Sequence, residues 1–95
     1  MKIKRKYIFE AQIIQNKGMD AAYIIFPYDI RKEFGRGRVS VEASFDGVPY
    51  KGSIVNMGVK NENGEICYVI GVKKDIRRKI GKTFGDIIKV EITEL

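Results

Sequence analysis

Residues 72–92 read VKKDIRRKIGKTFGDIIKVEI, which describes a short helical stretch, a glycine stop, a tight glycine turn and a strand. Nearly the same phrase occurs earlier in the chain, where DIRKEFG at 29–35 aligns with DIRRKIG at 75–81. The segment VSVE at 39–42 then follows the first copy as IKVE at 88–91 follows the second. These matches predict an internal pseudo-repeat of a strand–short helix–strand unit.

Alternation of apolar and polar residues predicts the strands around these two copies. Asp46–Gly47, between two such runs, is the strongest short hairpin signal in the chain. Residues 56–64 are polar with two glycines, and we expect a loop there. The predicted strands are 7–15, 21–26, 39–45, 48–55, 65–72 and 87–93. Six strands with two very short helices predict a mainly β fold that closes into one small barrel.

Helix boundaries are marked by proline, aspartate and glycine. Pro27 suits the first position of a helix, and Asp29 falls in the first turn, where a carboxylate meets the positive end of the helix. Gly35 is the expected helix end. In the second copy we expect Asp75 to repeat the role of Asp29 and Gly81 that of Gly35.

Length and composition limit the class of protein. At 95 residues we expect one domain covering 1–95, because a chain of this size has one small core. Hydrophobic residues make up 44% and charged residues 32%, as in soluble globular proteins. No apolar run approaches the ~20 residues that cross a bilayer, and the N-terminus lacks a signal-peptide core. We therefore expect a cytoplasmic protein with no membrane partner.

Several kinds of catalytic site are excluded by composition. The chain has no histidine and one cysteine, Cys67, so it cannot form a Ser–His or Cys–His nucleophile pair or a zinc site with imidazole ligands. Cys67 is expected as a small core residue of a strand. Asp29 and Asp75 are better explained as residues at helix starts than as a catalytic pair. Residues 35–38 leave a helix for a strand, so their glycines do not form a phosphate-binding loop. We expect no enzymatic activity and no cofactor.

Positive charge is concentrated in the two helix regions. The net charge is +6 and the pI is about 9.5, which favours a nucleic-acid partner. Phosphate contacts would give salt-sensitive binding with little sequence preference. The interpretation we favour for these bases is that they form solvated helix faces. The candidate contacts to anions or nucleic acid are Arg31, Arg36, Arg38, Arg77, Arg78 and Lys82.

Two family resemblances follow from these residues. Residues 72–90 resemble the swapped-hairpin pattern of AbrB and MazE-type transcription factors, although Lys73 stands where that pattern has proline. Residues 9–92 are more similar to the family called domain of unknown function 1905. The matching segments are YIIFP at 23–27, GRGRV at 35–39, FDGVPY at 45–50, GSI at 52–54, MG at 57–58 and the second helix. This resemblance implies a small closed double-split β-barrel in which one chain carries both halves, so that a monomer is sufficient to close it.

The resemblance brings no established activity with it. We therefore predict a non-catalytic β-barrel module that binds a ligand or protein partner not identified by the sequence. The alternative is an AbrB-like DNA-binding protein that uses the basic helix regions. A concave site lined by several polar groups would favour ligand binding, whereas salt-sensitive retention on duplex would favour DNA binding.

Overall fold

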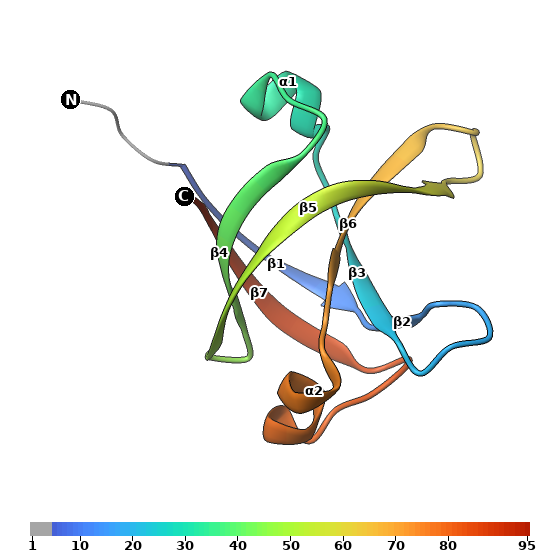
Figure 1. The fold of residues 1–95 in the computed structure, drawn as a ribbon, viewed down its shortest axis with the longest axis vertical. Coiled ribbons are helices and arrows are strands. Elements are labelled where there is room, and N and C mark those ends of the chain that lie inside the picture. Colours follow the sequence, from blue (N-terminus) through green and yellow to red (C-terminus); the bar gives the residue numbers. More distant parts are fainter. Residues whose placement is uncertain (1–4) are drawn as a thin grey trace.

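The computed structural model describes residues 5–95 as one curved antiparallel sheet with two short helices (Figure 1). This confirms the predicted mainly β class with two helices. Neither helix among these residues is long and apolar enough to span a membrane. The elements are β1 (Lys6–Gln12), β2 (Ile14–Gln15), β3 (Ala22–Phe26), α1 (Ile30–Phe34), β4 (Val39–Phe45), β5 (Val48–Lys60), β6 (Ile66–Gly71), α2 (Lys74–Ile80) and β7 (Ile87–Glu94).

The sheet has the strand order β1-β7-β4-β5-β6-β3-β2, with antiparallel pairing throughout. Its first and last strands are consecutive in sequence and are separated only by Ile13. The Ile13 N–H donates to the Asp86 carbonyl at 2.8 Å, and the Ile13 carbonyl accepts from the Gly85 N–H at 2.7 Å. The strand predicted over 7–15 is therefore interrupted where the chain exchanges β7 for β3 as its partner.

The inner face of the sheet forms the core. In β4 the inward residues are Val39, Val41, Ala43 and Phe45, as the alternation predicts, and all four are buried. β3 is apolar throughout, yet it alternates between buried and half-buried residues. Its outer face carries Tyr23 and Ile25, which are only partly covered. Although all its residues are apolar, β3 therefore has only one face in the core.

β5 continues five residues beyond its predicted end. Its pairing with β4 stops at Ile54, so residues 55–60 pair only with β6 and project as a two-stranded hairpin. A bulge interrupts this pairing after Asn56, whose side-chain Oδ1 accepts from the Gly58 N–H at 2.9 Å. Gly58 has φ +80°, which explains the glycine there. The predicted loop 56–64 is therefore mostly strand, because a solvated hairpin arm does not require apolar residues.

The two helices begin differently despite the repeat. Asp29 caps α1: its Oδ1 accepts from the N–H of Arg31 at 2.9 Å and of Lys32 at 3.4 Å. Asp75 lies in the first turn of α2, as predicted, but it is not the cap, because α2 begins earlier in the repeat and its cap position is Lys73, which makes no side-chain cap. The predicted glycine ends are confirmed, with left-handed C-caps that end both helices. α1 and α2 lie at opposite ends of the long axis (Figure 1).

Candidate functional site

The six candidate anion contacts fall into two separate groups. Arg31, Arg36 and Arg38 accompany α1, whereas Arg77, Arg78 and Lys82 accompany α2 at the other end of a molecule 38 Å long (Figure 1). The structure therefore does not bring them together on one surface. The same separation applies to the acidic residues of the two helices, which cannot act as a carboxylate pair.

At the α2 end, basic residues line a hollow of about 360 Å³. Most of their charge is already paired with nearby carboxylates. Asp20 lies 3.0 Å from the Lys74 Nζ and 3.3 Å from an Arg77 Nη, and Lys82 lies 2.7 Å from Asp46. Of the basic residues that line the hollow, Arg78 alone makes no ion pair with any residue of 5–95. An incoming phosphate would have to compete with these carboxylates.

Arg77 is part of the structure at this end of the molecule. Arg77 is 6% exposed, and it is the one buried charged residue within 5–95. Its Nε donates to the Val72 carbonyl at 3.2 Å, and its guanidinium lies 4.9 Å from the centre of the Phe84 ring. With Asp20 as its ion partner, Arg77 ties α2 to the end of β6 and to the turn before β3. The sequence does not show this, because Arg77 and Arg78 are adjacent bases in the same helix.

Lys82 also has a structural partner. Its Nζ donates to the Ile87 carbonyl at 2.8 Å and lies 2.7 Å from Asp46 Oδ2. Asp46 itself sits in the predicted hairpin turn with φ +47° and accepts from the Lys89 N–H at 2.7 Å. The hydrogen bonds from Lys82 and then from the Lys89 backbone lower the pKa of Asp46. This carboxylate therefore joins the β4–β5 turn to β7.

Replacing Asp46 with asparagine is expected to reduce the loss of stability in acid. Because the pKa of Asp46 is lower in the folded protein than in the unfolded chain, its contribution is present above pH ~4 and lost as the pH falls through the folded pKa. Asp46→Asn keeps a side chain that tolerates positive φ, and we expect it to cost about 1 kcal/mol near neutrality. Urea unfolding from pH 2.5 to 7 measures both effects, with the exposed Asp75→Asn as control. An unchanged acid slope in Asp46→Asn would contradict the assignment.

The basic residues at the α1 end are unpaired by comparison. Arg31, Arg36 and Arg38 are exposed, and none makes an ion pair with another residue of 5–95. Gly37 gives the Arg31 guanidinium room, since a Cβ at that position would lie 3.0 Å from Arg31 Nη2. These three side chains are the part of the predicted set that remains free to meet an anion.

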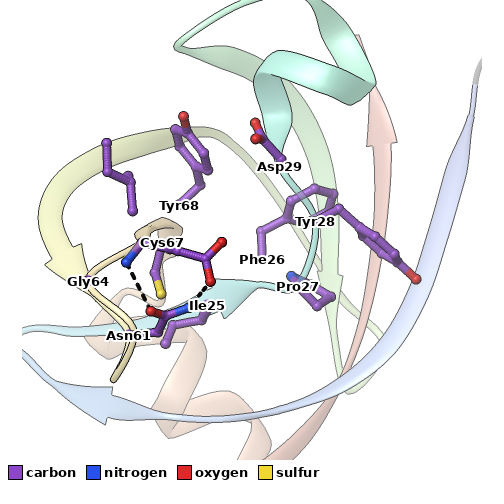
Figure 2. Close-up of a pocket in the computed structure, with 11 residues that line it drawn as sticks. Ile25, Phe26, Pro27, Tyr28, Asp29, Asn61, Gly64, Cys67 and Tyr68 are labelled. Atoms are coloured by element: carbon purple, nitrogen blue, oxygen red, sulfur yellow. Dashed lines mark hydrogen bonds between the residues drawn. The ribbon is translucent and has the colours of Figure 1, made fainter.

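A larger hollow of about 670 Å³ lies at the same end, between the β3–α1 connection and the β5–β6 hairpin (Figure 2). We call it the hairpin groove. It carries two carboxylates, from Asp29 and Glu65, and no lysine or arginine. Its lining residues are Ile25, Phe26, Pro27, Tyr28, Asp29, Asn61, Gly64, Glu65, Ile66, Cys67 and Tyr68. Cys67, expected in the core, is instead half-buried and lines this groove.

Hydrogen bonds within the hairpin turn fix one wall of the groove. Asn61 Oδ1 accepts from the N–H of Asn63 at 2.9 Å and of Glu65 at 3.0 Å, and its Nδ2 donates to Glu65 Oε1 at 3.4 Å. The dashed lines in Figure 2 mark the bonds between Asn61 and Glu65. Asp29 on the opposite wall is fixed by its capping role. Hydrogen bonds therefore hold in place the backbone that carries each of the two carboxylates, Asp29 and Glu65.

Aromatic side chains line the inner part of the groove. Tyr68 is 5% exposed and pairs with Phe26 across β3 and β6, so that both rings lie on the core side. The Tyr68 hydroxyl makes no hydrogen bond with any residue of 5–95. Tyr28 is 47% exposed, and its ring centroid lies 5.5 Å from that of Phe26 and 5.3 Å from that of Tyr7. The groove thus offers ring surface and one hydroxyl with unused hydrogen-bonding capacity.

Sequence reasoning did not find the hairpin groove. Its walls come from residues 25–29 and 61–68, which only the pairing of β3 with β6 brings together. Among residues 5–95, no group of three or more Cys, Asp or Glu side chains could hold a metal ion. The groups that line the groove are carboxylates, hydroxyls, a thiol and apolar side chains.

Comparison with known protein families matches residues 9–92 to the family described as Domain of unknown function (DUF1905). The chain belongs to this family. The match includes both helices and every residue of the hairpin groove. Comparison with curated proteins gives no match. The description of the DUF1905 family carries no activity, so the function of this member must be argued from its own surface.

Proposed function

We propose that this DUF1905 domain is a non-catalytic binding module and that its ligand site is the hairpin groove. The observation that carries the proposal is the groove itself, in which carboxylates, a hydroxyl and aromatic rings converge on one hollow. Its volume of about 670 Å³ lies within the ~300–1,000 Å³ of small-ligand sites. Side chains fill the interior of the sheet, so a ligand would bind at its end rather than inside it.

The proposed scaffold is a double-split barrel closed by a single chain. Support comes from the sheet order, whose two outer strands, β1 and β2, are joined directly at Ile13. Closure at this point leaves the β5–β6 hairpin projecting next to the start of α1. A rigid barrel with one projecting hairpin presents the groove at a defined position, as a binding site on rigid elements requires.

Amide NMR spectra test the site directly. A panel containing an amine, a carboxylate, a phosphate and a neutral sugar is titrated into the labelled protein. We expect at least one compound to shift the amides of residues 64–68 and 28–29, and Tyr68→Phe to weaken that binding. Tyr50→Phe, at the α2 end near Lys73, is the matched control and should bind normally. If no compound in the panel shifts these amides, or if Tyr68→Phe and Tyr50→Phe behave alike, the groove is not the site.

Nucleic-acid binding is the second candidate, and one observation favours it. Arg31, Arg36 and Arg38 are exposed without an ion partner among residues 5–95, so their charge is available to phosphates. We expect Arg36→Ala with Arg38→Ala to weaken binding to a mixed-sequence duplex and to reduce its salt dependence. Fluorescence anisotropy at low salt and at ~150 mM measures this, with Arg78→Ala as the basic control at the other end. Equal binding by all three proteins would remove this candidate.

A further inference from the structure

We propose that the hairpin groove selects a cationic group, a primary ammonium or a guanidinium carried on a short apolar stem. This inference rests on the proposed function of the groove. Its first support is electrostatic. The chain carries a net charge of +6, yet the groove is lined by Asp29 and Glu65 with no basic residue. The local charge is therefore opposite to that of the whole protein and favours cations.

The two carboxylates retain acceptors for a ligand. Asp29 uses Oδ1 for the helix cap, and its Oδ2 makes no hydrogen bond with any residue of 5–95. Glu65 makes one long contact, 3.4 Å from Asn61 Nδ2. The helix that Asp29 caps has only five residues, so its dipole offsets little of this negative charge. Both carboxylates can accept charge-assisted hydrogen bonds from an ammonium or guanidinium.

Tyr68 supplies a neutral hydrogen-bonding group in the lining of the groove. Tyr68 is 5% exposed and its hydroxyl makes no hydrogen bond within 5–95, but the described residues contain no fully buried side-chain polar atom without a partner, so water or a ligand can reach this hydroxyl. It lines the groove and can accept a hydrogen bond from a bound donor. In Figure 2 the Tyr68 hydroxyl and the Asp29 carboxylate point toward the same side of the groove. A ligand N–H in the groove can donate to either group.

Apolar residues fit the rest of such a ligand. The Tyr28 side chain points away from the hairpin in Figure 2 and packs on Phe26 and Tyr7, so it holds the β3–α1 wall in place. Pro27 and Ile66 add apolar surface for a short hydrocarbon stem. A guanidinium or ammonium on three or four methylenes has both the charge and the stem that this lining would recognise.

The test compares four probes that share one stem. n-Butylammonium, n-butylguanidinium, n-butanol and butyrate are titrated into the full chain while the amides of 28–29 and 64–68 are followed by NMR. We expect the two cations alone to bind, with dissociation constants on the order of 1 mM because the probes are small. Binding should weaken between low salt and ~150 mM salt. Stronger or equal binding of butanol or butyrate would overturn the cation proposal.

Charge-removing variants separate a specific site from general attraction. Asp29→Asn keeps an N-cap residue and Glu65→Gln keeps the contact with Asn61, so the pair removes charge with little change in shape. We expect the double variant to bind n-butylguanidinium about tenfold more weakly, the loss of a charge-assisted hydrogen bond. Asp75→Asn, an exposed carboxylate at the α2 end, should bind as the parent does. Equal binding by the double variant and the parent would overturn the proposal. If the double variant does not fold, Glu65→Gln alone, which changes a residue of the exposed turn, replaces it in the same comparison.

The two levels of the proposal fail in different ways. If an anion or a neutral compound shifts the groove amides and the cations do not, the groove remains the ligand site and its assigned ligand class is wrong. If neither the four probes nor the wider panel shifts any groove amide, both the ligand class and the binding function of the groove are wrong.

Discussion

Phe26→Ala is expected to lower the free energy of unfolding by about 3–5 kcal/mol, the usual cost of removing a buried phenylalanine ring. Phe26 is 2% exposed and lies at the centre of the aromatic cluster at the α1 end. Its ring centroid is 5.2 Å from that of Tyr7, 5.8 Å from that of Phe9 and 5.5 Å from that of Tyr28. Removal leaves a cavity among rings that β1, β3 and the β3–α1 connection hold in place, so the site cannot collapse easily.

Denaturant unfolding of three variants measures this effect. Phe26→Leu keeps most of the volume and should cost no more than about 1.5 kcal/mol. Ile8→Ala, at a position 57% exposed on the outer face of β1, should change stability by less than about 0.5 kcal/mol. A Phe26→Ala cost similar to that of Ile8→Ala would show that the aromatic cluster does not stabilise the fold.

Phe26→Leu should also weaken binding in the hairpin groove, because Tyr28 loses a ring that positions it.

Local sequence signals were sufficient for the strands and turns that depend on local chemistry. The alternation over 39–45 places the inward side chains of β4 correctly, and Asp46–Gly47 forms the expected hairpin. Gly35 and Gly81 end the helices because few other residues adopt a left-handed C-cap without strain. In each case the determining contacts lie within a few residues of one another.

Features that depend on distant segments could not be predicted in the same way. The break at Ile13 arises because its backbone bonds residues 85 and 86, and the length of β5 depends on where β4 stops pairing. The internal repeat was informative about element order and misleading about individual side chains. Arg31 and Arg77 occupy equivalent repeat positions, yet Arg31 is exposed and Arg77 is buried, because Asp20 and Phe84 meet only α2.

The candidate site shows the same limit. The basic residues were visible as a composition bias, but whether each charge is free depends on partners far away in sequence, such as Asp46 for Lys82. The hairpin groove had no local signature at all. The sequence predicts Asp29 as a residue at a helix start, and its place in a groove appears only when the hairpin at 61–68 lies beside it.

Arg77→Ala is the second large effect, and we expect it to lower the free energy of unfolding by about 2–4 kcal/mol. The variant removes the hydrogen bond to the Val72 carbonyl and the contact with the Phe84 ring, and it opens a cavity under α2. The ion pair with Asp20 adds less, because Asp20 is exposed and water can replace its partner. Arg77→Met, which keeps the apolar stem, should recover part of the loss.

Arg78→Ala is the matched control for Arg77→Ala, since it removes the same side chain from the next position, where it is exposed. We expect a change of less than about 0.5 kcal/mol for Arg78→Ala in urea unfolding. Equal effects at the two positions would contradict the structural role of Arg77. A large difference would also mean that DNA binding at the α2 end must be tested with Arg78 alone, because a variant lacking Arg77 loses stability whether or not it binds nucleic acid.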